Sequence, residues 1–208
     1  MNDRIKRYLI DGEGDMLDYK QEISNANKIA KTMVSFANHK GGTLLVGIRD
    51  NRSIAGIRTE DEKYMLDLAA SLYCKPEITL DILEHDIGGK VVLECIVPEG
   101  DNKPYSAKGE DGKWWVYIRN KDKSLLASKI VVDVLRRQAS NKGTLIKYGK
   151  NEEMLLKYLA ENERITLNEF KKKINISRWR ASKILVNLIS AGVIRNHTHE
   201  KTEFYTLA

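Results

Sequence analysis

The spacing of apolar residues changes several times along the first two thirds of the chain. Short alternating or continuously apolar runs predict strands at residues 16–23, 43–48, 78–84, 91–97 and 114–119, with 53–57 returning as a hairpin strand. Helical spacing predicts helices between Asn25 and Asn38, near residues 60–74 and over 128–138. This mixed order predicts an α+β domain built on one mixed sheet over residues 1–138.

The last third of the chain follows a different plan. Apolar residues at helical spacing predict helices at 152–161, 167–174 and 178–191, with a short strand at Ile165-Thr166 and two alternating runs at 193–195 and 203–207. Helix, helix, turn, helix and hairpin is the order of a winged helix-turn-helix domain, placed at 151–208. The Ser-, Asn- and Gly-containing stretch 139–150 predicts a linker.

The positive charge of the chain is concentrated in this last part. The whole chain carries 35 Lys plus Arg and 29 Asp plus Glu, a net +6. Residues 140–208 carry 13 Lys plus Arg and 7 Asp plus Glu, a net +6. The entire surplus therefore lies there, and the preceding residues are neutral, with 22 basic and 22 acidic side chains. The asymmetry indicates a basic module that faces a polyanion, although a solvated helix face with extra lysines gives the same count.

Composition narrows the class of protein. With 42% apolar residues the chain is expected to fold rather than stay disordered. No apolar run reaches the roughly 18 to 20 residues of a membrane span, and the first residues lack the apolar core of a signal peptide, so we expect a cytoplasmic protein without a membrane partner. Cys74 and Cys95 have no CxxC neighbour, which excludes disulfide-rich and Cys-rich zinc folds.

The predicted third helix of the C-terminal domain carries candidate DNA-contacting residues. The second helix of a helix-turn-helix motif enters the major groove by its N-terminal residues. The candidates are Ser177, Arg178, Trp179, Arg180, Ser182, Lys183 and Asn187, with Arg195 and Lys201 in the wing; Lys171, Lys172 and Lys173 are further candidates for phosphate contacts. Double-stranded DNA is the expected partner. The alternative is a module for protein interaction or for dimerisation into a homodimer, in which Trp179 is a core or interface aromatic.

Two wing histidines suggest a metal site at first sight. His197 and His199 are alternate residues of a strand, so they share one face. Apart from Glu200, no carboxylate or thiol that could complete the metal site is apparent nearby in the sequence. A solvated wing is therefore the preferred interpretation.

Several motifs in the larger domain carry a family resemblance. They are Glu13-Gly14-Asp15-Met16-Leu17-Asp18-Tyr19-Lys20, Phe36-Ala37-Asn38, Gly41-Gly42, Gly47-Ile48-Arg49-Asp50, Pro104-Tyr105 and Tyr117-Ile118-Arg119. In this order they resemble the Schlafen AlbA-type domain, once described as a divergent ATP-binding domain, over roughly residues 10–138. Bacterial members followed by a winged helix are described as predicted transcriptional regulators, and the present arrangement is similar to theirs.

The resemblance also implies a catalytic alternative. In mammalian Schlafen proteins the related fold cleaves structured RNA with acidic residues at these motif positions. They correspond here to Glu13, Asp18 and Asp50 as ligands of Mg²⁺ or Mn²⁺, with Lys20 beside them as a further catalytic residue. Asp18 is one methylene shorter than the family's glutamate. RNA is the partner that this alternative implies.

No cofactor is expected for the DNA-binding interpretation. Gly41-Gly42-Thr43 and Gly88-Gly89-Lys90 lack the spacing of a phosphate-binding loop, so ATP binding has no motif to support it, and Gly41-Gly42 is interpreted as a helix stop. Three hypotheses remain: a DNA-binding regulator whose AlbA-like domain senses a ligand, dimerises or adds nucleic-acid contacts; a metal-dependent endoribonuclease; and a protein-interaction adaptor.

Overall fold

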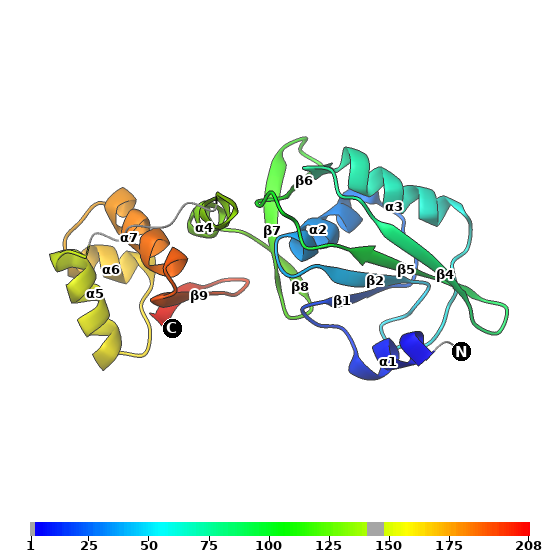
Figure 1. The fold of residues 1–208 in the computed structure, drawn as a ribbon, viewed down its shortest axis with the longest axis horizontal. Helices are drawn as coiled ribbons and strands as arrows, with labels where there is room; N and C mark the ends of the chain where they lie inside the picture. Colours follow the sequence, from blue (N-terminus) through cyan, green and yellow to red (C-terminus); the bar gives the residue numbers. More distant parts are fainter. Residues whose placement is uncertain (1–2, 141–147) are drawn as a thin grey trace. The chain divides into compact units, whose positions relative to one another are not determined.

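The computed structural model describes residues 3–140 and 148–208 (Figure 1). The chain divides into two compact units, residues 1–126 and residues 127–208. Each unit has its own apolar core, and each is described by itself.

The described residues of the first unit form three helices and eight strands. In chain order they are α1 (Asp3–Asp11), β1 (Leu17–Lys20), α2 (Ala26–Ala37), β2 (Gly42–Val46), α3 (Asp61–Leu72), β3 (Cys74–Lys75), β4 (Asp81–Asp86), β5 (Val91–Val97), β6 (Ser106–Lys108), β7 (Trp114–Asn120) and β8 (Lys123–Leu126). The α+β class predicted from the sequence is confirmed. Helix α1 was not predicted.

These strands form two sheets, not the single sheet predicted. The first has the order β1-β2-β5-β4 and is mixed, since β1 pairs with β2 in parallel while the other pairs are antiparallel. The second has the order β3-β6-β7-β8 and is antiparallel. The predicted strand 114–119 belongs to the second sheet. The predicted hairpin strand 53–57 is reduced to an isolated bridge between Ile48 and Ile54.

Helix α2 explains why there are two sheets. Nine of its residues are buried, which is more than one face of a helix supplies, so it needs apolar partners on more than one side. It contacts β5 of the first sheet and β6, β7 and β8 of the second. Its side chains Met33, Val34 and Phe36 are fully buried in the largest core cluster. The helix is therefore packed between the sheets, where a single continuous sheet would leave half of it uncovered.

The glycine pair after α2 ends the helix, as predicted. Gly41 has a φ of +75°, and a Cβ there would lie 2.8 Å from the carbonyl oxygen of Val97. A Cβ on Gly42 would lie 2.5 Å from the Phe36 ring. Both glycines thus serve the turn and close packing, in agreement with their interpretation as a helix stop.

The second unit contains the elements predicted for the C-terminal domain. They are α4 (Lys129–Ala139), α5 (Lys150–Glu161), α6 (Leu167–Lys173), α7 (Arg178–Ser190), β9 (Ile194–Thr198) and β10 (Glu203–Leu207). Strands β9 and β10 form an antiparallel pair, and Ile165 adds a bridge to Tyr205. Buried side chains from α5, α6 and α7 and from both strands form one core, which includes Leu155, Phe170 and Leu185.

Helix α4 lies in a different unit from the one expected. A domain boundary was predicted at residue 138, which would leave α4 with the larger domain. Instead Ile130 and Val134 of α4 are buried in the core of the second unit, and α4 packs against α7. Residues 141–147 of the predicted linker lie outside the described residues. Across the described helices, none has both the length and the apolar content needed to cross a membrane.

Candidate functional site

The start of α7 presents a basic and aromatic surface. Ser177 caps the helix, because its hydroxyl oxygen accepts a hydrogen bond from the backbone N–H of Arg180 at 3.2 Å. Apolar residues on the opposite face, among them Ala181 and Leu185, are buried. Arg178, Trp179 and Arg180 are exposed, and the Trp179 side chain is 68% exposed. Packing of the apolar face therefore turns the predicted DNA-contacting residues outward.

A groove of about 580 Å³ runs between α4 and α7. It is lined by Lys129, Asp133, Arg136, Arg137, Arg178, Trp179, Ser182, Lys183 and Val186. The Lys183 ammonium lies 5.0 Å from the centre of the Trp179 ring, within cation–π range. Four predicted site residues of α7 are thus brought together with four charged residues of α4.

Asn187 is placed differently from its predicted role. Its amide oxygen accepts a hydrogen bond from a guanidinium nitrogen of Arg137 on α4, and the residue is half-buried. A side chain held in this way is not presented for contact with a base. Its observed role is to join α4 to α7.

The β9–β10 hairpin, predicted as the wing, has two predicted cations at its surface and packs its histidines. Arg195 on β9 and Lys201 in the following turn are both exposed. The rings of His197 and His199 stack against Phe204, with centroids 4.8 Å and 5.8 Å apart. His197 is half-buried, so the prediction of a merely solvated wing is incomplete. The two histidines form an aromatic cluster around Phe204.

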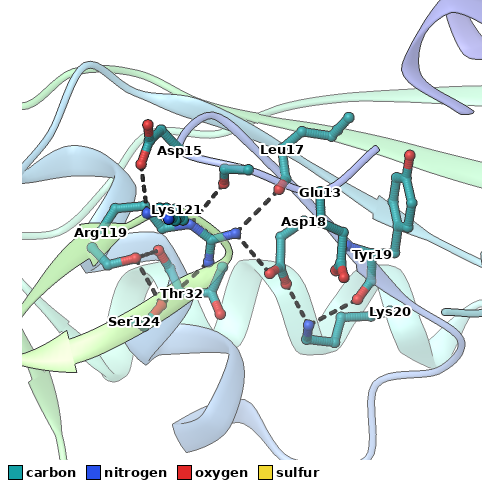
Figure 2. A network of polar contacts seen from close by, with 12 residues as sticks. Glu13, Asp15, Leu17, Asp18, Tyr19, Lys20, Thr32, Arg119, Lys121 and Ser124 are labelled. Carbon is teal, nitrogen blue, oxygen red and sulfur yellow. Dashed lines mark hydrogen bonds and ion pairs between the residues drawn. The ribbon is translucent and has the colours of Figure 1, made fainter. Parts of the chain in front are cut away.

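The predicted acidic site lies on β1, where Asp18 is buried. Figure 2 shows the Arg119 guanidinium between this carboxylate and the backbone of the preceding loop. Its Nη2 donates to Asp18 Oδ1 at 2.9 Å and to the Leu17 carbonyl at 3.1 Å, and its Nε donates to the Gly14 carbonyl at 3.0 Å. The guanidinium carbon also lies 4.7 Å from the centre of the Phe36 ring. Asp18 is consequently one half of a buried ion pair.

The other predicted acidic-site residues make different contacts. Lys20 forms an ion pair with the second oxygen of Asp18 and donates to the Tyr19 carbonyl at 2.8 Å. Glu13 Oε1 accepts from the Tyr19 backbone N–H at 2.8 Å, and Figure 2 shows its side chain beside Asp18 and Lys20. Asp50 is exposed in the turn after β2, and in the described chain it shares no hydrogen bond or ion pair with the other three.

This arrangement does not fit the metal site implied by the family resemblance. Among residues 3–140 and 148–208, no group of three His, Cys, Asp or Glu side chains is placed to hold one ion. Both oxygens of Asp18 already receive cationic donors, which compete with a metal for the same lone pairs. The residues therefore do not form the ligand set that a two- or three-carboxylate Mg²⁺ site requires.

Two motif residues have structural roles that were not predicted. Asn38, at the end of α2, donates through Nδ2 to the carbonyls of Tyr105 and Tyr117, both at 2.8 Å, and accepts from the Tyr105 N–H at 2.7 Å. Arg119 reaches back to the loop before β1. The motifs that contain them were recognised in the sequence, but nothing in the spacing indicates which motif contacts which.

A second buried carboxylate was missed entirely. Glu94 on β5 has no exposed surface, and its Oε1 accepts from the Tyr8 hydroxyl at 3.0 Å and pairs with Arg4 Nε at 2.7 Å. Its Oε2 lies 2.8 Å from His85 Nε2. These contacts attach α1 to the first sheet. The carboxylate is satisfied inside the unit and is assigned a structural role.

The unit boundary also changes the distribution of charge. Residues 127–208 carry 16 Lys plus Arg and 8 Asp plus Glu, a net +8. Residues 1–126 carry 19 and 21, a net −2. Assigning α4 to the second unit therefore strengthens the asymmetry seen in the sequence.

Two solved structures resemble the chain at low identity. One is the DIP2311 protein from Corynebacterium diphtheriae, 17% identical with a TM-score of 0.47, covering 71% of this chain and 29% of that chain. The chain thus spans less than a third of that protein. The other is the N-terminal domain of an ATP-dependent DNA helicase RecG-related protein from Nitrosomonas europaea, 24% identical with a TM-score of 0.44, covering 57% of this chain and 86% of that chain.

No curated protein matches the chain. A family model does: the Schlafen, AlbA_2 domain matches residues 13–128, which is more than half of the chain and includes both Asp18 and Arg119. The chain belongs to the Schlafen AlbA_2 family.

Proposed function

We propose that this protein is a DNA-binding regulator whose C-terminal unit is a winged helix-turn-helix that binds double-stranded DNA. The observation that carries the proposal is the start of α7, where a capped helix presents Arg178, Trp179 and Arg180 to solvent. It does so in a unit with a net charge of +8. A helix of this kind enters the major groove by its first turns.

The chemistry of the exposed side chains supports this binding mode. Arginine donates two parallel hydrogen bonds to guanine, and lysine and arginine neutralise phosphates. Arg178 and Arg180 are the proposed base-reading residues. Lys171, Lys172 and Lys173 of α6 and the wing residues Arg195 and Lys201 are proposed phosphate contacts, because all belong to elements that flank α7 in the sequence and in the fold.

The larger unit has a separate proposed role. Its net charge of −2 gives no general attraction for nucleic acid. We assign it ligand sensing, dimerisation or local nucleic-acid contacts, as in the hypothesis drawn from the sequence. Metal-dependent RNA cleavage remains the alternative from the family resemblance, and the ion pairs of Asp18 weigh against it.

Titration of the full chain with a labelled DNA duplex over a range of salt concentrations tests the proposal. We expect log K to fall linearly with log salt, with a slope of about −0.9 for each phosphate neutralised. A chain that does not bind duplex, or binds with no salt slope, contradicts the proposed function. Binding only to a protein partner supports the adaptor hypothesis instead.

A further inference from the structure

Helix α4 has one face in the core of the second unit and another beside α7. Ile130 and Val134 are buried with Leu185 and other α7 residues. Lys129, Asp133, Arg136 and Arg137 line the groove on the α7 side. The helix is therefore a fixed part of this unit, and its charged face is held next to the proposed recognition helix.

The charges in this groove are strongly unbalanced. Five cationic side chains line it, from both helices: Lys129, Arg136, Arg137, Arg178 and Lys183. The single acidic residue that lines it, Asp133, pairs with Arg136 at 3.3 Å. The Arg136 and Asp133 side chains are 65% and 37% exposed, so the pair is weak and leaves the guanidinium available. The groove therefore has the electrostatics of a polyanion-binding surface.

Contacts with α4 cover only part of α7. Towards the end of that helix, Val186 is 7% exposed and Asn187 is bonded to Arg137. Towards its start, Arg178, Trp179 and Lys183 are exposed. The half of α7 that a helix-turn-helix inserts into DNA is thus the half that α4 leaves open.

From these observations we infer that α4 is a second phosphate-binding element of the DNA interface, and this inference rests on the proposed function. A helix inserted in the major groove has a phosphate backbone along each side, because the groove is about 12 Å wide. A basic helix fixed beside the inserted one faces one of those backbones. Lys129 and Arg136 contact its phosphates, while the apolar surface of Trp179 packs against the sugars.

Arg137 has a different role in this arrangement. Because its guanidinium bonds Asn187, it acts as a positioning residue that sets the separation of α4 and α7. The phosphate contacts themselves come from the two exposed cations, Lys129 and Arg136. This division identifies which substitutions test the inference without disturbing the helix packing.

The test compares duplex affinity over a salt series for the wild type and for Lys129→Ala plus Arg136→Ala. We expect the salt slope to become shallower by about 1.8, two contacts at about 0.9 each, and the affinity at 0.1 M salt to fall on the order of 60-fold. The charge-matched control is Lys150→Ala plus Lys157→Ala on α5, which removes two exposed lysines that do not line the groove and should keep more of the wild-type salt slope. Lys129→Arg plus Arg136→Lys keeps both charges and should restore binding.

The outcomes separate this inference from the proposed function. If the wild type binds and Arg178→Ala plus Arg180→Ala weakens binding, while the α4 double variant has the wild-type slope, the α4 inference is wrong and the proposed function stands. Tighter binding by the α4 variant also overturns it, since α4 would then mask α7. If no duplex binding occurs at all, both fail. Equal melting temperatures of the variants exclude unfolding as the cause.

Discussion

Arg119 on β7 donates a hydrogen bond to the buried carboxylate of Asp18 on β1, across 2.9 Å and between the two sheets of the larger unit. The Arg119 side chain is 1% exposed, so the guanidinium depends on this carboxylate for charge compensation. Removing one member of a buried ion pair leaves the other charge uncompensated, which is more costly than losing the pair itself. A residue at a position that the family resemblance marks as catalytic is therefore placed to hold the fold together.

Asp18→Ala is expected to destabilise the larger unit by about 3 to 5 kcal/mol, because the Arg119 guanidinium would stay buried without its carboxylate. Urea denaturation measures the loss. The matched control is Asp15→Ala, which removes an exposed acid of the loop before β1 whose carboxylate accepts from the Lys121 N–H at 2.6 Å. We expect about 1 kcal/mol for this control. An Asp18 variant as stable as the control, combined with loss of RNA cleavage, would favour the catalytic role instead.

Substitution of Asn38 tests the connection between α2 and the second sheet. Asn38→Ala removes three hydrogen bonds to the backbone of Tyr105 and Tyr117 and leaves those groups unpaired. We expect a loss of about 2 to 4 kcal/mol in the free energy of unfolding, measured with denaturant. Asn27→Ala is the control, because that side-chain amide makes one bond, to the Lys108 carbonyl, on the surface. Similar losses for both variants would contradict the assigned role.

The two cysteines should be unreactive in the folded protein. Burial raises the pKa of both the Cys74 and Cys95 thiols to about 12. At pH 8, four units lower, roughly one thiol in ten thousand is ionised, and the thiolate is the reactive form. A thiol reagent at pH 8 should therefore modify neither residue in native buffer and both in denaturant. Rapid modification of either cysteine under native conditions would show that the core around it is open.

Trp179 offers a direct optical report of the proposed interface. The chain has three tryptophans, and Trp114→Phe plus Trp115→Phe leaves Trp179 as the single one. Its exposed ring should move to a less aqueous environment when duplex DNA fills the groove, which changes its fluorescence. A titration that reaches saturation by anisotropy of the DNA but leaves the Trp179 emission unchanged would place the binding surface elsewhere.

The sequence predicted local helices and strands better than it predicted the contacts between residues far apart in the chain. Helices α5, α6 and α7 follow from apolar spacing, and the capping residue Ser177 marks the start of α7; both are short-range signals. The family resemblance located Asp18 but not its ion pair with Arg119, because the two residues lie about a hundred positions apart and no spacing rule connects them. The same limit applies to Asn187 and Arg137.

Assignment of α4 failed for a related reason. Its helical pattern was predicted over residues 128–138, but an amphipathic helix needs only an apolar partner, and the pattern does not say which domain supplies it. The structure shows that Ile130 and Val134 find that partner in the second unit. Because α4 belongs to the second unit, its Lys129 and Arg136 side chains become part of the proposed DNA interface.

The most direct test of the account is the ratio of duplex DNA affinities of the wild type and of Arg178→Ala plus Arg180→Ala, measured at 50 mM and 200 mM salt. The account predicts weaker binding by the variant at both concentrations, because the base contacts of both arginines are lost. It also predicts a smaller change between the two concentrations, because two positive charges are removed from the interface. Lys150→Ala plus Lys157→Ala should stay closer to the wild type in both respects. Equal affinities and equal salt dependence for the wild type and the arginine variant would contradict the claim that α7 is the DNA-binding helix.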